Sequence, residues 1–328
     1  MKLLVTGGLG FIGSNFIQKI LTEHPEHDIL NVDAEFLGSN KKNLKEIHDD
    51  KKYEYVKGNI TNKKLMEKLI SQSDIVINFA AESHVDRSIN DANPFLISNF
   101  QGTFTILDII TKQNKPMIQI STDEVFGSLT TESANEYSRF NPSSPYAATK
   151  AAAELLINSY CVTFNSKAII TRCTNNFGPK QFAEKLIPKT IILANKNKKI
   201  PIYGKGSNIR DWIFVNDHCD AIHSVMLNGK YGESYNISGD NELDNITIVK
   251  KILELMNKSE DLIEFVEDRP GHDFRYSMSS EKITKELKWN AKTKFQNGLE
   301  STIKWYLDNT DVWNDVSENI LNPTPWKN

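Results

Sequence analysis

The chain has 328 residues, 39% of them hydrophobic and 25% charged, which suits one large domain or two moderate ones. Its net charge of −3 provides no broad positive field for nucleic acid, and its three scattered cysteines show no pairing that indicates a disulfide framework or a metal site. No apolar run reaches the ~18 to 20 residues of a membrane span and the start, MKLLVTGG, lacks a signal-peptide layout, so we expect a cytoplasmic protein without a membrane partner.

A glycine-rich turn joins the first predicted strand, residues 2–6, to the first predicted helix. Gly7, Gly10 and Gly13 permit a tight turn and a close approach of the backbone to a ligand. The free N–H groups and partial positive charge at the start of the helix suit a pyrophosphate. The context of strand, turn and helix favours a dinucleotide site over a plain turn without a ligand.

The second predicted strand, residues 29–32, ends at Asp33, twenty residues after Gly13. An acid at this place bonds the 2′-hydroxyl of a ribose and repels a 2′-phosphate. No arginine occurs between Asp33 and Lys52, and only Lys41 and Lys42 count against the preference. We therefore expect NAD rather than NADP.

Strands and helices continue to alternate, with strands expected at residues 53–56, 74–79 and 117–120 and helices at 64–70 and 94–111. This alternation predicts an α/β fold with a doubly wound parallel sheet of the Rossmann type. Ligands gather at the carboxyl ends of such strands. The polar residues expected there are Asn59, Glu82, Ser83, His84, Thr122, Asp123 and Glu124. A structural role and a site role are equally favoured for His84.

Tyr146 and Lys150 lie four residues apart in a helix that Ser144 and Pro145 begin. On one helical face the ammonium can approach the phenol and lower a pKa that starts near ~10. Tyr146 would then serve as a base near neutral pH. Small residues on another face of this helix, together with the helix at 94–111, suit either a dimer surface or packing within the chain.

After residue 174 the alternation becomes irregular and basic residues occur among aromatic ones. Arginine suits phosphate and an aromatic face can stack on a base, so this region is expected to form a smaller substrate-binding lobe. We expect residues 1–174 to form the NAD-binding domain, with 213–239 returning to it. Residues 175–212 and 240–328 would form the interleaved lobe.

Several segments resemble the extended short-chain dehydrogenase/reductase family and, within it, the dTDP-glucose 4,6-dehydratases. The glycine turn and the pair Tyr146 and Lys150 indicate only the broad family. More specific are FAAESHVDRSI (79–89), STDEVFG (121–127), TRCTNNFGPKQFAEKLIP (171–188), PIYGKGSNIRDW (201–212) and RPGHDFRY (269–276). The triplet 122–124 discriminates most, because related 4-epimerases normally carry small hydroxyl residues or alanine there.

The resemblance implies a lyase that converts dTDP-glucose to dTDP-4-keto-6-deoxy-glucose and water. Tyr146 would take the proton of the 4-hydroxyl while hydride passes to NAD⁺, and Thr122 would bond the 4-oxygen. Glu124 would then remove the C5 proton, and a protonated Asp123 would deliver a proton to the departing 6-hydroxyl, which leaves as water. Hydride would then return to C6. Lys150 would bind the nicotinamide ribose. The family usually forms homodimers, so a homodimer is expected.

By the same resemblance, further site residues are carried onto matching positions, and they join the turn glycines, Asn59 and His84, which the residue pattern singled out. Cofactor contacts are expected at Gly7, Gly10, Phe11, Ile12, Gly13, Asp33, Asn59, Ile60, Ala80, Ala81, Ser98, Tyr146, Lys150 and Asn176. Substrate contacts are expected at Ser83, His84, Thr122, Asn175, Lys185, Leu186, Pro201, Tyr203, Arg210, Asn245, Arg269, His272 and Tyr276. The chain departs from the family at Asn59, where an aspartate is usual, and at Phe126 and Phe177, where tyrosines are usual.

Three alternatives remain beside this reading. A UDP-sugar 4,6-dehydratase stays open because thymine and uracil differ by one methyl group, and discrimination of that group is worth only about 1–3 kcal/mol in an apolar pocket. A nucleotide-sugar 4-epimerase has the same fold, but Asp123 and Glu124 argue against it. A non-catalytic nucleotide-sugar sensor would not require the four reactive side chains.

Overall fold

Seven parallel strands form the main sheet, in the order β10-β6-β5-β4-β1-β2-β3. The computed structural model describes residues 1–314, 316–321 and 326. Strand order reverses between β1 and β4, which is where ligands bind in doubly wound sheets. The strands are β1 (Lys2–Thr6), β2 (Asp28–Asp33), β3 (Tyr53–Lys57), β4 (Ile75–Asn78), β5 (Met117–Thr122), β6 (Ala168–Cys173) and β10 (Ser234–Ile237). The predicted fold class is confirmed.

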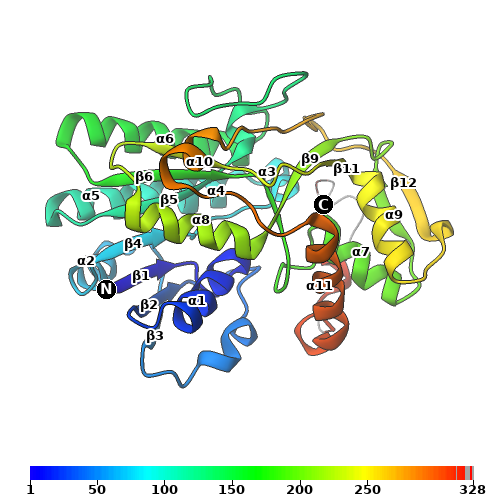
Figure 1. The fold of residues 1–328 in the computed structure, drawn as a ribbon, viewed down its shortest axis with the longest axis horizontal. Coiled ribbons are helices and arrows are strands. Elements are labelled where there is room, and N and C mark those ends of the chain that lie inside the picture. Colours follow the sequence, from blue (N-terminus) through cyan, green and yellow to red (C-terminus); the bar gives the residue numbers. More distant parts are fainter. Residues whose placement is uncertain (315, 322–325, 327–328) are drawn as a thin grey trace.

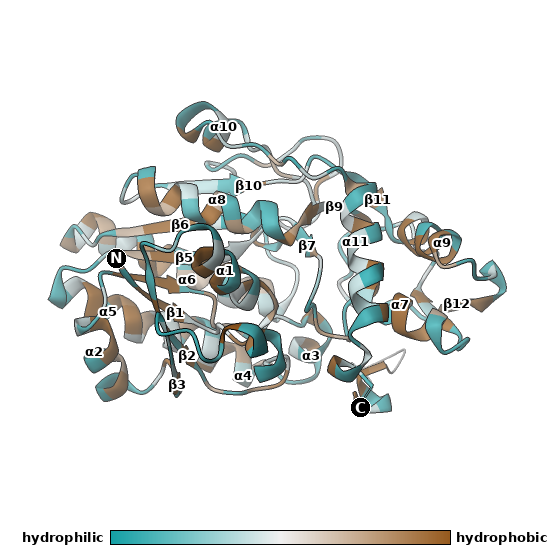
Figure 2. Ribbon diagram, turned by 60° about the horizontal axis from the view of Figure 1, so that its bottom comes forward, coloured by the Kyte–Doolittle hydropathy of each residue, from teal (hydrophilic) through white to brown (hydrophobic). Residues whose placement is uncertain are grey.

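Helices cover both faces of this sheet because alternate strand residues are apolar on each side. Leu3 and Val5 belong to a core with α1 (Phe11–Glu23) and α8 (Val215–Asn228). Leu4 belongs to a second core on the opposite face, with α2 (Lys63–Ser71), α5 (Thr103–Gln113) and α6 (Pro145–Phe164). Figure 2 shows hydrophobic colour along the strands of the main sheet.

The helix predicted at 94–111 is interrupted. After α3 (Val85–Asn90), it begins as α4 (Asn93–Phe95), passes through a π-helical turn, Leu96–Gly102, and continues as α5. Asn114, in the left-handed conformation, ends α5. Such a turn inside a helix often lies at a functional site, and Ser98 in this one lines the cavity described below.

A smaller group of elements lies beside the sheet, on the right of Figure 1. One small sheet has the order β11-β9-β7 and another pairs β12 with β8. The elements are β7 (Asn175–Phe177), α7 (Leu186–Asn195), β8 (Ile200–Tyr203), β9 (Ile209–Phe214), β11 (Glu242–Asp244), α9 (Asn245–Leu255), β12 (Ile263–Val266) and α11 (Phe295–Asp308). Short 3₁₀ turns occur at Lys41–Ile47, Asp123–Phe126, Glu260–Leu262, Thr310–Val312 and Glu318–Leu321.

The chain returns to the main sheet through α8 and β10, with α10 (Glu281–Leu287) beside β10. The expected return of residues 213–239 to the NAD-binding domain would place a strand around Ile213 in the main sheet, and that placement is wrong. That strand is β9, which pairs with β7 and β11. None of the helices in the described part of the chain has the length and apolar character that a bilayer span requires. The cytoplasmic location stays a prediction.

Candidate active site

The turn after β1 has no space for side chains at two of its glycines. Gly7 has a φ of +68°, and a Cβ there would lie 2.7 Å from the backbone nitrogen of Ala80. A Cβ on Gly13 would lie 2.6 Å from the Gly7 carbonyl oxygen. Helix α1 begins after Gly10, and no side chain of the described residues caps it, which leaves its first N–H groups available to an anion. This cradle fits a pyrophosphate.

The Asp33 carboxylate lies at the end of β2, beside this turn. It accepts hydrogen bonds from the Leu9 nitrogen at 3.0 Å, from the Glu35 nitrogen at 2.8 Å and from Ser39 Oγ at 2.8 Å. These bonds fix its orientation without using every acceptor site of a carboxylate. Asp33 therefore keeps the capacity to bond a ribose hydroxyl.

The two lysines that counted against NAD are both engaged by other groups. Lys41 Nζ lies 2.7 Å from Glu35 Oε1, and Lys42 Nζ donates to the Asp311 carbonyl oxygen at 2.6 Å. The bond from Lys41, with others from Tyr55 and Lys57, lowers the pKa of Glu35 to about 2. A charged carboxylate thus holds Lys41, which disfavours its use for a 2′-phosphate.

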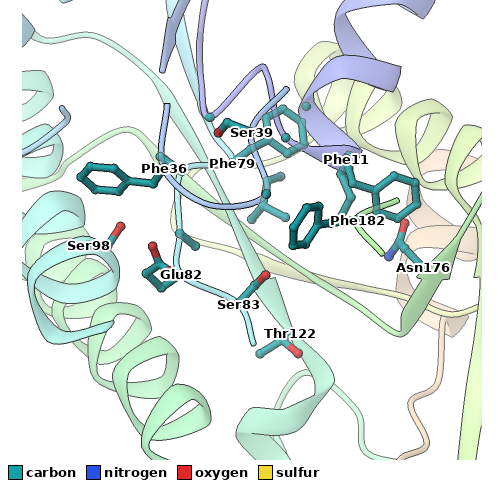
Figure 3. A pocket seen from close by; sticks show the side chains of 18 of the residues that line it. Phe11, Phe36, Ser39, Phe79, Glu82, Ser83, Ser98, Thr122, Asn176 and Phe182 are labelled. Carbon is teal, nitrogen blue, oxygen red and sulfur yellow. The ribbon is translucent and has the colours of Figure 1, made fainter. Parts of the chain in front are cut away.

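A cavity of about 290 Å³ runs along the carboxyl edge of the main sheet. All fourteen residues predicted to contact the cofactor line it, and so do the five predicted catalytic residues. Figure 3 shows that its lining comes from distant segments, with Phe11 of α1, Thr122 of β5 and Asn176 of β7 around one space.

The triplet 122–124 begins where β5 ends and the chain enters a 3₁₀ turn. Thr122 Oγ1 accepts a hydrogen bond from the Glu124 nitrogen at 3.3 Å and donates one to Asp123 Oδ1 at 3.1 Å. The other Asp123 oxygen, Oδ2, is buried without a hydrogen-bond partner among the described residues. An unpartnered carboxylate oxygen in an apolar place favours the protonated acid.

The two carboxyl groups differ in their electrostatic surroundings. Burial raises the pKa of Asp123 well above its ordinary value, and the Glu124 charge raises it further. Burial also raises the pKa of Glu124, but the cations Arg269, Lys185 and Arg210 oppose that rise. Asp123 is therefore the group that stays protonated more readily, and Glu124 the one that ionises more readily.

Tyr146 and Lys150 face the same cavity from α6. Lys150 Nζ donates to the Ile120 carbonyl oxygen at 2.5 Å, and burial lowers its pKa to about 8. Burial raises the pKa of Tyr146 well above 10, and Glu124 adds to this rise. The sequence predicted that Lys150 lowers the pKa of Tyr146, and this is wrong for the protein alone, because burial raises that pKa.

The predicted substrate residues divide into two groups. Ser83, Thr122, Asn175 and Lys185 line the cavity, and Lys185 Nζ donates to the Ser83 carbonyl oxygen at 2.9 Å. The others lie outside that lining: His84, Leu186, Pro201, Tyr203, Arg210, Asn245, Arg269, His272 and Tyr276.

Several of these outer residues donate hydrogen bonds to two carboxylates, those of Asp86 and Asp273, which the sequence analysis did not single out. Asp86 accepts hydrogen bonds from Tyr203 Oη and from Arg269 Nη1, both at 2.9 Å. Asp273 accepts one from Tyr276 Oη at 2.7 Å. The sequence signal for Asp86 was its place in the segment FAAESHVDRSI.

The Tyr276 hydroxyl connects this outer group to the triplet, because it also lies 3.5 Å from Glu124 Oε2. The Arg210 guanidinium lies over the Tyr276 ring, 4.2 Å from its centroid. His272 and Trp326 each place a ring edge-on to Tyr203, with centroids 6.2 and 4.9 Å away. A polar and aromatic wall thus continues outward from the cavity.

His84 precedes α3 and is buried, with Nε2 3.9 Å from Glu184 Oε2. Burial and nearby cations hold its pKa well below 6.5, so the ring is neutral. Glu82, expected at a strand end, also lines the cavity, and further lining residues that sequence reasoning missed are Phe36, Leu37, Ser39, Arg87, Cys173, Phe182 and Glu184. Most of them lie within two or three residues of a predicted contact.

The departures from the family pattern are accommodated locally. Asn59 Oδ1 accepts from the nitrogen of Thr61 at 2.9 Å and so holds the turn after β3. Phe126 and Phe177 are buried among other aromatic rings. Among the described residues, no group of three or more His, Cys, Asp or Glu side chains is arranged to hold a metal ion.

A Rossmann-type sheet, a glycine turn and a tyrosine and lysine at its carboxyl edge define the class of extended short-chain dehydrogenases/reductases. A profile of the family described as GDP-mannose 4,6 dehydratase matches residues 4–302. The chain therefore belongs to this family.

Individual relatives cover nearly the whole chain. "Low-salt glycan biosynthesis protein Agl12" of Haloferax volcanii is 45% identical over 94% of this chain and 99% of its own. The dTDP-glucose 4,6-dehydratase of Mycobacterium tuberculosis is 40% identical over 97% of each. The crystal structure of the Streptomyces venezuelae dTDP-glucose 4,6-dehydratase with NAD and TYD bound has a TM-score of 0.95 and 38% identity, over 97% of this chain and 100% of that one. The resemblance noted in the sequence is confirmed.

Proposed function

We propose that this chain is a dTDP-glucose 4,6-dehydratase, a lyase that forms dTDP-4-keto-6-deoxy-glucose and water from dTDP-glucose. The observation that carries this proposal is the triplet 122–124 at the end of β5, in the same cavity as Tyr146 and Lys150. An oxidation site with an acid and a base beside it can carry out elimination, whereas an epimerase needs neither carboxyl group.

The cofactor is NAD. A dinucleotide without a 2′-phosphate fits the glycine cradle and the Asp33 carboxylate. Lys41 is paired with Glu35, which disfavours its use for a 2′-phosphate. When bound, NAD supplies a reversible acceptor for the hydride that leaves C4 and returns to C6. Lys150 would hold the nicotinamide ribose, since its ammonium lies at the carboxyl edge of β5.

Tyr146 would remove the proton of the sugar 4-hydroxyl, with Thr122 bonded to the same oxygen. Burial makes the Tyr146 phenol hard to ionise, and the Lys150 cation, four residues further along α6, would favour the phenolate. The resulting 4-ketone makes the C5 hydrogen acidic. Glu124 takes that proton, and Asp123 protonates the departing 6-oxygen, which leaves as water.

Residues 175–212 and 240–328 would form the nucleotide-sugar-binding lobe, and 1–174 with 213–239 the NAD-binding domain. This division is supported by the polar and aromatic residues Tyr203, Arg210, Arg269 and Tyr276, which continue outward from the cavity beside Glu124. Arg269 presents a buried Nε without a hydrogen-bond partner among the described residues, which suits a phosphate oxygen.

The active protein would be a homodimer that pairs α5 and α6 with those of a second copy. Leu96, Ile97, Phe100 and Phe104 are exposed on the π-helical turn and α5, and Leu155 and Val162 on α6. Adjacent helices with apolar outer faces suit a self-complementary contact.

Incubation of the purified protein with dTDP-glucose and, separately, UDP-glucose tests the function. We expect the alkali-induced absorbance of a 4-keto-6-deoxy product from dTDP-glucose at the higher kcat/KM. Faster turnover of UDP-glucose would show that the protein prefers the uracil nucleotide to the thymine nucleotide. A galactose product without loss of water would indicate an epimerase, and inertness toward both would support a sensor.

A further inference from the structure

A fully buried ion pair lies directly beneath the catalytic edge. Arg172 Nη2 and Nε lie 2.7 and 2.8 Å from Glu154 Oε2, and the exposed fractions of the two side chains are 2% and 0%. Glu154 Oε1 accepts a hydrogen bond from Ser121 Oγ. Ser121 is the residue before Thr122, so this pair connects α6 and β6 to the strand that presents the triplet.

The same pair reaches a fourth element. Arg172 Nη1 donates to Asn236 Oδ1 at 3.3 Å, and Nη2 donates to Ser234 Oγ at 3.4 Å, both on β10. The guanidinium also lies over the rings of Phe126 and Phe140, 5.2 and 5.3 Å from their centroids. Every strong donor and acceptor of the pair is thus directed within the fold rather than toward solvent.

Stability alone does not explain such a pair. Removing two charges from water costs so much that well-packed apolar residues of similar volume often serve equally well. A buried pair is better explained where its charge or its geometry is used nearby. Tyr146, Lys150 and Glu154 recur at intervals of four along α6, which places them on one face of the helix.

The positive charge of Lys150 is the one that a carboxylate at this place stabilises most. It is buried, its Nζ bonds a neutral carbonyl, and no carboxylate pairs with it directly among the described residues. Burial lowers its pKa to about 8, and Glu154 is the main group that opposes the loss of its charge, followed by Cys173. Burial raises the pKa of Cys173 to about 12, so this thiol is neutral and Glu154 is the charge that matters.

We propose that Glu154, anchored by Arg172, is a positioning residue that keeps Lys150 protonated and holds Ser121 in register beneath the catalytic triplet. This inference rests on the proposed function for its consequence in turnover, but the charge of Lys150 can be measured without substrate. Arg172 acts through Glu154, since it fixes the carboxylate without approaching the cavity.

The test compares two variants that both remove the carboxylate. Glu154→Gln leaves Arg172 unpaired and lowers the unfolding midpoint, whereas Glu154→Gln with Arg172→Met removes both charges and restores much of it. The titration of Lys150 is followed by NMR of ¹³Cε-labelled lysine in the full-length protein, with Lys150→Arg to assign the signal. We expect the midpoint to fall from about 8 by roughly one pH unit or more in Glu154→Gln, and by less in the double variant, because that variant also removes the positive charge of Arg172.

Two controls separate this effect from general damage. Glu154→Asp retains the charge and should leave the midpoint near that of the unmodified protein. Lys19→Met with Asp220→Asn removes an ion pair between α1 and α8, whose atoms lie 2.9 Å apart, and should leave Lys150 unchanged. A Lys150 midpoint that is unshifted in both folded variants would overturn the proposal.

The same preparations are assayed with dTDP-glucose. We expect kcat of Glu154→Gln to fall about fivefold or more at pH 8, and less at pH 6.5, where more of Lys150 stays charged. If the unmodified protein has no activity with dTDP-glucose, the proposed function is wrong. The titration of Lys150 would still decide the role of Glu154.

Discussion

Asp123 and Glu124 are consecutive in the chain and both are desolvated by burial, yet nearby cations oppose the rise in pKa more effectively at Glu124 than at Asp123. One buried oxygen of Asp123 has no hydrogen-bond partner within the described part of the chain, and burial raises the pKa of this carboxyl well above its ordinary value. The pKa of Glu124 is raised less strongly because Arg269, Lys185 and Arg210 oppose the effect of burial. Two carboxyl groups whose pKa values are pushed apart can serve as acid and base in one reaction.

Glu124→Gln should abolish proton removal at C5. A glutamine cannot accept the proton, so exchange of the C5 hydrogen with deuterated solvent should fall by roughly a hundredfold or more. Exchange is measured by mass spectrometry of recovered sugar nucleotide. Asp123→Asn is the matched variant, because it should retain C5 exchange and lose elimination of water. Normal exchange in Glu124→Gln would show that another group is the base.

Tyr146→Phe should slow the first oxidation and leave the cofactor bound. The ring keeps its packing against Phe95, whose centroid lies 6.2 Å away, while the hydroxyl that accepts the proton is lost. We expect transient reduction of the cofactor, followed by absorbance in single turnovers, to slow by roughly 10²- to 10⁴-fold. Loss of the cofactor from the variant would point instead to a structural role.

Arg269→Lys should weaken substrate binding more than it slows chemistry. Lysine cannot both pair with Asp86, 2.9 Å from Nη1 of Arg269, and present a second planar donor to a phosphate. Loss of one charge-assisted bond predicts a rise in KM of roughly tenfold to a hundredfold with a small change in kcat. Arg275→Lys is the control, because Arg275 pairs with Glu242 at 2.6 Å and has no predicted role in the site. Equal effects of the two substitutions would contradict the assignment.

Local patterns in the sequence predicted the glycine turn, Asp33 and the strand ends, because each depends on residues close in the chain. The pairing of β9 with β7 and β11 was missed, since it depends on contacts between distant segments. Asp86 was missed for the same reason: its partners Tyr203 and Arg269 lie 117 and 183 residues away in the chain. The pKa of Tyr146 was misjudged because helical spacing reports proximity and not desolvation.

The outer faces of α5 and α6 predict the oligomeric state. Phe100→Glu with Phe104→Glu places charges on the exposed apolar surface of the π-helical turn and α5, and should convert a dimer to monomers in sedimentation velocity. Tyr137→Glu is the control, because Tyr137 is 83% exposed in the loop before α6 and lies outside the apolar surface. A protein that sediments as a monomer before substitution, or as a dimer after it, would exclude this interface.

Stability should fall in acid because of buried neutral histidines. Burial lowers the pKa of His218 to about 3 and that of His223 to about 4, both below the ordinary value of 6.5. The unfolded chain therefore binds more protons than the folded one below pH 6.5, and each histidine removes up to ~1.4 kcal/mol of stability per pH unit as the pH falls through that range. His223 stacks on His24 with centroids 3.7 Å apart, away from the cavity.

In urea unfolding from pH 7.5 to 5, His223→Gln should flatten the dependence of stability on pH, whereas His48→Gln, at a side chain 81% exposed, should not. Identical slopes for His223→Gln and the unmodified protein would assign the acid sensitivity to other groups.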